Sequence, residues 1–397
     1  MSLKQLPKSI WILGLVSMLM DISSEMIHSI LPLFMVSVLG LSAASIGLIE
    51  GVAEATAMVV KVFSGSLSDY WGKRKGITAF GYALSALTKP LFALANGVGF
   101  VFTARLLDRV GKGIRGAPRD ALIADITPAE QRGAAFGLRQ SLDTLGAFIG
   151  PLVAVGLMLL WANDFRAIFW VAVVPALLAT ALIFFGVTEP DQQEKAKLGN
   201  PLSRAHLGQL GRPYWLVVCI GGAFTLARFS EAFLILRAQQ VGVPIAYVPL
   251  VLVAMNVVYA ASAYPFGHWS DRWNRATLLA WGLVVLIAAD VVLASSTNWI
   301  SLLVGVALWG VHLGMTQGLL AALVAHTAPA QLRGTAFGLF YLVSGLALLI
   351  ASTVAGVLWD RFGAVTTFYA GAFFCVCTLL LMFGLRGNLF SKSTTQA

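Results

Sequence analysis

Long apolar segments, separated by short polar connections, make up most of this 397-residue sequence. A helix needs about 20 largely apolar residues to cross a bilayer, and segments of this kind fall into two sets. The first set lies near residues 9–37, 43–67, 77–96, 99–122, 134–160 and 166–187. The second lies near residues 213–240, 245–267, 277–295, 299–325, 334–358 and 365–385. The pattern predicts an all-α membrane protein with twelve transmembrane helices.

The longest polar stretch, residues 188–212, separates the two sets. It predicts a hydrophilic linker between an N-terminal six-helix bundle, residues 1–187, and a C-terminal six-helix bundle, residues 213–397. The chain starts with a short basic stretch that leads directly into the first apolar segment. This start indicates a first spanning helix and not a cleaved signal peptide.

Two short segments recur at a nearly constant spacing. The sequence TPAEQRGAAFGL at 127–138 matches APAQLRGTAFGL at 328–339, an offset of 201 residues. The sequence GSLSD at 65–69 matches GHWSD at 267–271, an offset of 202 residues. The two halves are therefore expected to be pseudo-symmetric copies in a 6+6 arrangement, an architecture that is typical of secondary transporters.

Charge is scarce and unevenly distributed. Only 11% of the residues are charged and 58% are hydrophobic, whereas a soluble protein carries about 25% charged residues. One side of the predicted membrane topology carries fifteen Lys and Arg in its loops, and the other side carries only Arg166 and Arg361. Positive loops face the cytoplasm, so both termini and the linker are expected there, in a multi-pass protein of a bacterial-type cytoplasmic (inner) membrane.

This distribution also bears on partners and cofactors. The net charge of +9 lies in short loops and inside helices, which argues against a nucleic-acid partner and leaves the lipid bilayer as the expected surroundings. The three cysteines fit neither a disulfide framework nor a zinc site. No metal and no cofactor are expected.

Three motifs resemble those of the major facilitator superfamily. The stretch GSLSDYWGKRK at 65–75 resembles its signature loop, and GHWSDRWNR at 267–275 resembles a degraded second copy. RLLDRVG at 105–111 resembles the helix-4 arginine motif that is linked to proton coupling, and GAFIGP at 146–151 resembles the helix-5 stretch of proton-coupled exporters. The resemblance implies a secondary transporter, not an enzyme, that works as a monomer. It also implies gating roles for Gly65, Asp69, Gly72, Lys73, Arg74, Gly146, Gly150, Pro151, Asp271 and Arg272.

Ionisable residues inside spanning helices are costly and usually face the protein interior. The fourth predicted helix carries seven of them on one face: Arg105, Asp108, Arg109, Lys112, Arg115, Arg119 and Asp120. At the repeat offset, the corresponding positions of the second half are largely uncharged. The fold therefore does not require these charges, which favours a functional role. Arg115, Arg119 and Asp120 lie near the cytoplasmic end and are expected to form a gating or structural ion cluster.

Arginine does not release its proton usefully, so a carboxylate must carry any coupled proton. The candidates are Asp21, Glu25, Asp108, Asp143 and Glu231. A surplus of guanidinium groups favours a substrate with carboxylate or phosphate groups. The candidate substrate-binding residues are Arg105, Arg109, Arg139, Arg228, Asn256 and Gln317.

The first hypothesis is therefore proton-coupled export of a small polar or anionic compound by alternating access. Efflux of hydrophobic drugs is an alternative, and a non-transporting membrane receptor or scaffold is another. Divalent-metal transport through Asp21, Glu25, His28 and the glutamates of the second helix is a further alternative, although the nearby arginines oppose a cation. Glu50 and Glu54 could instead be solvated outside the membrane, and His312 is expected to be a hydrogen-bonded core residue.

Overall fold

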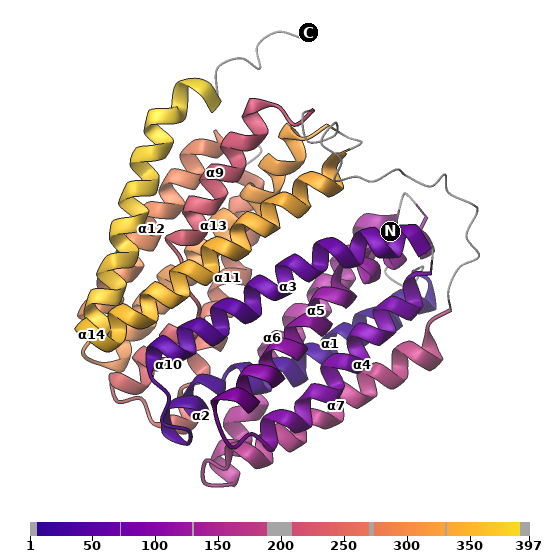
Figure 1. Cartoon of the computed structure of the whole chain (residues 1–397), viewed down its shortest axis with the longest axis horizontal. Coiled ribbons are helices and arrows are strands. Elements are labelled where there is room, and N and C mark those ends of the chain that lie inside the picture. The colour runs from indigo at the N-terminus through magenta and orange to yellow at the C-terminus, as the bar shows by residue number, and fades with distance from the viewer. Residues whose placement is uncertain are drawn as a thin grey trace. The chain divides into compact units, whose positions relative to one another are not determined.

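The computed structural model describes residues 6–71, 73–128, 131–188, 209–269, 274–329 and 332–389, and its regular elements within these ranges are helices (Figure 1). The first half contains α1 (Lys8–His28), α2 (Leu31–Ser37), α3 (Ala43–Trp71), α4 (Arg74–Ala93), α5 (Val98–Ile126), α6 (Arg132–Leu160) and α7 (Phe165–Gly186). The second half contains α9 (Arg212–Leu226), α10 (Ala232–Gln240), η3 (Ile245–Tyr247), α11 (Leu250–Trp269), α12 (Arg275–Ser295), α13 (Trp299–Thr327) and α14 (Arg333–Leu389).

These helices confirm the prediction of an all-α protein with twelve spanning segments, and four of the segments differ in detail. The first segment is divided into α1 and α2 next to Pro32, which lacks an N–H and cannot continue the helix. The seventh is divided into α9 and α10 by residues 227–231. The last two segments form α14, in which Gly363 interrupts the helix with a φ of 85° and a ψ of 169°. This left-handed conformation favours glycine.

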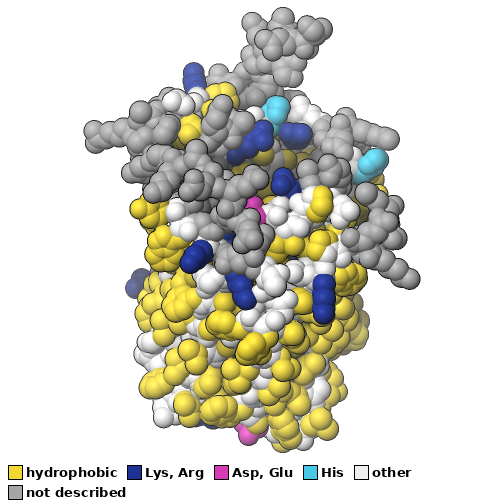
Figure 2. Space-filling model, turned by 90° about the vertical axis from the view of Figure 1, so that its right-hand side faces the viewer, with side chains coloured by type: hydrophobic (Ala, Val, Ile, Leu, Met, Phe, Trp, Pro, Cys, Tyr) yellow, Lys and Arg dark blue, Asp and Glu magenta, His cyan; other side chains and the backbone are white. Residues whose placement is uncertain are grey.

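The surface and the helices have the character of a membrane protein. Seven helical stretches of the described chain are long and apolar enough to cross a membrane. Helices α3, α4 and α5 carry more charge, but Glu50, Lys89 and Arg105 are almost fully buried. On the face drawn in Figure 2, hydrophobic side chains cover most of the surface, and the visible Lys and Arg lie mainly toward one end. The chain is a multi-pass integral membrane protein.

Two compact units share the chain. The first comprises residues 1–42, 52–198 and 243–253, and the second comprises residues 43–51, 199–242 and 254–397. Helix α3 belongs to both, because its first turns pack within the second unit and the remainder packs within the first. The predicted linker, residues 188–212, lies mostly outside the described residues.

Helix bounds reproduce the internal repeat. Helices α4 and α12 begin at Arg74 and Arg275, and α5 and α13 begin at Val98 and Trp299, so both pairs differ by 201 residues. Helices α6 and α14 begin at Arg132 and Arg333, which gives the same offset. The two halves thus repeat in parallel order, as the sequence matches predicted.

Arginine side chains satisfy the C-terminal carbonyls of two equivalent helices. After α4, the guanidinium of Arg166 donates to the carbonyls of Ala93 (3.2 Å) and Ala95 (2.8 Å). At the end of α12, the guanidinium of Arg237 donates to Ala294 O (3.0 Å) and Ser296 O (2.8 Å), and to further groups there. The last carbonyls of a helix have no partner within the helix. Both halves therefore satisfy the carbonyls at the end of the equivalent helix, α4 or α12. The arginines that do so come from different sequence positions in the two halves.

The start of α3 is held by a carboxylate from α14. Asp360 accepts hydrogen bonds from the backbone N–H groups of Ala43 and Ala44, at 2.9 Å from each of its two oxygens. A negative charge at this position also meets the positive end of the helix dipole. The backbone of Gly356 lies so close that an added Cβ would be 2.6 Å from Cα of Ala44. These contacts fix the first turns of α3 within the second unit.

Glycine allows α6 to approach α1 closely. A Cβ at Gly146 would lie 2.6 Å from the carbonyl oxygen of Met18, and one at Gly150 would lie 2.8 Å from that of Ile22. Only residues without a side chain permit this separation. The GAFIGP motif therefore brings the α6 backbone against α1 at the level of Asp21 and Glu25.

We expect Gly150→Leu to destabilise the protein by about 1–3 kcal/mol or more, because an overpacked site forces its neighbours apart. Melting of the purified protein in detergent measures the loss. Gly156→Leu is the matched control, since no atom lies within 4 Å of a Cβ at that position of the same helix. Equal melting temperatures for the two variants would contradict this account of the motif.

Candidate transport site

Helix α5 carries the polar centre of the first unit. Among its charged residues, Arg105, Asp108, Arg109 and Arg115 are at most 4% exposed, whereas Lys112 is exposed. A buried charge is tolerated only when it is paired or hydrogen-bonded. The partners come from α1, α3 and α4, and together they form a continuous polar network.

A buried ion pair joins α4 to α5. The Nζ of Lys89 lies 2.9 Å from Oδ1 of Asp108 and donates a second hydrogen bond to the Ser24 hydroxyl on α1 at 3.0 Å. The second oxygen of Asp108 lies 3.6 Å from Nε of Arg109. The side chains of Lys89 and Asp108 are 1% and 4% exposed. Asp108, a predicted proton carrier, is thus held between two cations.

The guanidinium groups of α5 converge on Glu54 of α3. Its Oε1 lies 3.2 Å from Nη1 of Arg109 and 3.7 Å from Nη2 of Arg105. Arg105 also donates to Nδ1 of His28 at 2.8 Å. The Glu54 side chain is 26% exposed, so it is the carboxylate of this network that solvent reaches most readily.

This geometry corrects two readings of the sequence. Glu50 is fully buried and Glu54 is paired with arginines, so neither is a solvated residue outside the membrane. His28 presents its Nδ1 to a guanidinium, which is a poor setting for a metal cation. Within the described residues, no three His, Cys, Asp or Glu side chains are grouped as they would be to hold a metal ion.

A second cluster joins α5 to α6. Arg139 lies 3.2 Å from Asp120 and 3.3 Å from Asp143, its neighbour one turn away. Arg119 lies 3.2 Å from Asp120 and donates to the Ser17 hydroxyl at 2.8 Å. The predicted substrate-binding residue Arg139 is therefore engaged by two carboxylates.

Two side chains of α4, Tyr82 and Ser85, connect the network to this cluster. Arg115 lies over the Tyr82 ring, 4.9 Å from its centroid, and donates to the Ser85 hydroxyl at 2.5 Å. Arg119 also donates to the Tyr82 hydroxyl at 3.4 Å. Arg115 and Arg119 were predicted to belong to an ion cluster. Both bond to hydroxyl groups, and Arg119 also pairs with Asp120.

The two candidate carboxylates of α1 face α6. Asp21 lies against Gly146 and Glu25 lies against Gly150. The charge of Asp143 on α6 acts on Asp21, as do the charges of Lys112, Arg115 and Arg119 on α5. Asp21 is therefore linked electrostatically to the second cluster.

The candidate residues of the second unit lie around a helix break. Arg228 and Glu231 lie within the break between α9 and α10, and the charge of Glu231 and the hydroxyl of Tyr259 act on Arg228. The Tyr259 hydroxyl donates to Gln317 at 3.2 Å. Asn256 lies on α11, partly exposed. The buried His312 contacts the carbonyl of Gly282 through Nδ1 at 2.8 Å, which confirms it as a hydrogen-bonded core residue.

Part of the predicted gating set can be placed. A Cβ at Gly65 would lie 3.2 Å from Cβ of Ala117, so α3 packs closely on α5 there. Arg74 lies 2.8 Å from Asp125, and Lys73 is exposed. The Asp69 side chain, together with Gly72, Asp271 and Arg272, lies outside the described residues. Pro151 is buried inside α6.

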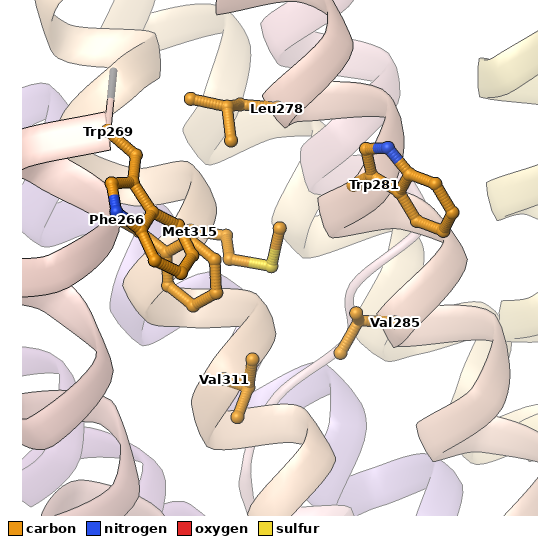
Figure 3. Close-up of a pocket in the computed structure, with 7 residues that line it drawn as sticks. All are labelled: Phe266, Trp269, Leu278, Trp281, Val285, Val311 and Met315. Atoms are coloured by element: carbon orange, nitrogen blue, oxygen red, sulfur yellow. The ribbon is translucent and has the colours of Figure 1, made fainter. Parts of the chain in front are cut away.

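An apolar cavity of about 290 Å³ lies in the second unit. Figure 3 shows its lining side chains from α11, α12 and α13, which are Phe266, Trp269, Leu278, Trp281, Val285, Val311 and Met315. None of them carries a charge. This cavity therefore differs in kind from the ion network of the first unit and suits only an apolar guest.

Sequence reasoning missed several buried ionisable residues, among them the two that are almost completely buried. Lys89 and Asp290 lie within predicted helices 77–96 and 277–295 and are 1% and 0% exposed. Each is an isolated charge inside an apolar segment, and this signal was available in the sequence. The pairing of Lys89 with Asp108 was not, because contacts between helices do not follow from sequence spacing.

The comparisons with known proteins agree with this architecture. The family model of the Major Facilitator Superfamily matches residues 13–237 and 229–395. The chain belongs to the major facilitator superfamily. It is 34% identical over 388 residues to an MFS-type transporter of Methanocaldococcus jannaschii, with 96% of each chain covered. This superfamily member is a transporter and not an enzyme.

More distant matches extend the likeness. The quinolone resistance protein NorA of Staphylococcus aureus is 21% identical, with 89% of this chain and 90% of NorA covered. A solved POT family transporter in complex with 5-aminolevulinic acid has a TM-score of 0.82 at 10% identity and covers 98% of this chain and 100% of its own. At this identity the solved structure shows a shared fold. A small-molecule substrate follows from membership of the superfamily.

We expect Lys89→Met to destabilise the protein by about 3–5 kcal/mol, because Asp108 would keep a buried charge that has lost its closest cation. Adding Asp108→Leu should recover much of this loss, since the double variant no longer contains the unpaired buried carboxylate. Thermal melting in detergent compares the variants. Lys112→Met, on the exposed side of α5, should melt like the wild type. A stable Lys89→Met single variant would contradict the buried pair.

Proposed function

We propose that this superfamily member is a proton-coupled exporter of a small polar or anionic compound. It would act by alternating access as a monomer in the cytoplasmic membrane, with both termini in the cytoplasm. The two bundles predicted from the sequence, residues 1–187 and 213–397, would change position to expose the site to each side in turn. The motif at 146–151 supports export, and the loop charges support the orientation.

The charge balance of the α5 network carries this proposal. Four cations, Lys89, Arg105, Arg109 and Arg115, are accompanied by two carboxylates, Asp108 and Glu54. The network therefore has a positive excess in a region from which water is largely excluded. An anionic group would reduce this excess, and guanidinium groups bind carboxylate and phosphate through paired hydrogen bonds. A lipophilic cation would be repelled.

The carboxylates near α6 are the proposed proton carriers. Asp21 and Asp143 act on each other electrostatically, and Arg139 lies beside Asp143. Two neighbouring carboxylates favour binding of one proton, whereas a nearby arginine favours release. A change in the Arg139 pairing would thus load or unload a proton. Glu25 and Glu231 remain candidates for the same role, and Arg228, Asn256 and Gln317 remain candidates for substrate contacts.

We expect organic anions to raise the melting temperature of the purified protein, because a ligand that binds only the folded state stabilises it. Amino acids, sugars, divalent metals and lipophilic cations would be compared at two pH values. Arg109→Lys keeps the positive charge but loses the forked arrangement of N–H donors in the guanidinium group. It should weaken anion binding by about tenfold or more, since hydrogen bonds to charged groups contribute about 1.5–3 kcal/mol.

Arg361→Lys supplies the control, because this exposed arginine belongs to the second unit, whereas the network belongs to the first. It should bind the stabilising anion as the wild type does. Stabilisation by metals or lipophilic cations alone would overturn the anion proposal and leave the α5 charges as a structural cluster.

Alternating access also predicts a role for the cap on α3. We expect Asp360→Ala to speed labelling of an Ala43→Cys variant by a membrane-impermeant maleimide, because the first turn of α3 would lose both acceptors. The loss of such a cap is worth about 0.5–2 kcal/mol. The native Cys219, Cys375 and Cys377 would first be replaced.

Asp164→Ala is the matched control for this experiment. Asp164 caps α7 by accepting from the N–H groups of Arg166 and Ala167. Its replacement therefore removes a cap of the same kind but leaves the cap on α3 in place. The labelling rate at position 43 should not change. Equal rates in the Asp360→Ala and Asp164→Ala variants would argue against a role for Asp360 in access.

Efflux of hydrophobic drugs is the second candidate function. The similarity to NorA and the apolar cavity of the second unit favour it. A hydrophobic compound that raises the melting temperature, with an effect lost in Trp281→Ala and kept in Arg109→Lys, would establish this candidate in place of the first.

A further inference from the structure

Asp290 is a fully buried carboxyl group in the second unit. It lies on α12, it is 0% exposed, and neither of its oxygens has a hydrogen-bond partner among the described residues. An ionised carboxylate without a partner is one of the most costly groups to bury. Its presence in the interior therefore requires a compensating ligand, and the smallest one is a proton.

The surroundings of Asp290 are closely packed. Gly371 of α14 lies so near that an added Cβ would be 2.7 Å from Oδ2 of Asp290 and 3.1 Å from the ring of Phe229. Phe229 lies in the break between α9 and α10, and its ring centroid is 5.4 Å from that of Trp309 on α13. The carboxyl group and the Phe229 ring thus both lie against the bare backbone at Gly371.

Few ionisable groups lie on the elements around Asp290. Cys375 on α14 is close enough to interact with its charge. His312 on α13 is bonded to the Gly282 carbonyl, and Arg237 on α10 is bonded to carbonyls at the end of α12. Arg228 and Glu231 flank Phe229 in the break. None of these groups hydrogen-bonds to Asp290 in the described part of the chain.

The internal repeat shows how the two units differ at this position. At the offset of 201 residues, Asp290 is equivalent to Lys89, and Trp309 is equivalent to Asp108. The first unit holds a fixed cation at this position, paired with a carboxylate. In the second unit the position holds an acid, and the partner position holds an indole whose buried Nε1 also lacks a hydrogen-bond partner.

We propose that Asp290 is a proton-binding site of the second unit, occupied by a proton in the conformation described here. The O–H of the acid removes the buried charge, and rearrangement of the Phe229 segment, which packs against the same glycine as the acid, would let the proton leave. If transport is proton-coupled as proposed above, this site is a second point at which a proton can enter the cycle. The occupancy itself does not depend on the substrate.

Infrared spectroscopy of the purified protein at neutral pH tests this occupancy directly. An un-ionised carboxyl group has a carbonyl stretching band that a carboxylate lacks. Asp290→Asn should remove the band intensity of one carboxyl group and leave the melting temperature at neutral pH at or above the wild-type value. Asp164→Asn, which changes an exposed carboxylate, should leave the band intact.

The pH dependence of melting provides the second readout. Raising the pH should lower the wild-type melting temperature as Asp290 is forced to ionise, and Asp290→Asn and Asp290→Leu should both reduce this dependence. An unchanged infrared band in Asp290→Asn would overturn the proposal. A loss of folding in both variants would also overturn it, because a neutral acid tolerates replacement by a neutral side chain. Neither result would bear on anion binding at Arg109, so the two proposals fail separately.

Discussion

Compensation of charge in a medium without water is the constraint on which this structure depends. Hydrocarbon offers no hydrogen bonds and little screening, so each ionisable group within the bundle must find a partner in the protein or lose its charge. Helix α5 illustrates the first solution. Its side chains at Arg105, Asp108 and Arg109 reach Glu54, Lys89 and His28 on three other helices. These bonds tie the helices of the first unit together and produce a positive centre.

The two halves answer the same constraint differently. Their helices begin at equivalent positions, so the backbone arrangement does not require the charges of α5. In the second unit, Val306, Trp309 and Gly310 stand where Arg105, Asp108 and Arg109 stand in the first. One copy thus supplies a polar network, and the other holds the buried acid Asp290 close to packed aromatic rings. On the proposals made above, such a division would let one half recognise an anion while the other responds to a proton.

Close contacts and interruptions of the helices lie next to these charges. Gly146 and Gly150 bring α6 against α1 beside Asp21 and Glu25. The break between α9 and α10 contains Arg228 and Glu231, and the break between α1 and α2 follows His28 directly. A helix interruption frees backbone groups and lets one segment turn relative to the next. The positions that can change shape are therefore those where charged groups lie.

The sequence by itself determined the number of helices, their approximate bounds and the repeat, because apolar length and a recurring offset are properties of a single chain. It also located the arginines of α5 and the motifs of the superfamily. Only the tertiary structure decided the pairings. Lys89 meets Asp108 and Ser24, and Glu54 meets two arginines, although no spacing along the chain specifies these contacts. The burial of Asp290 and its lack of a hydrogen-bond partner among the described residues became known only from the packing, since they depend on helices that are distant in sequence.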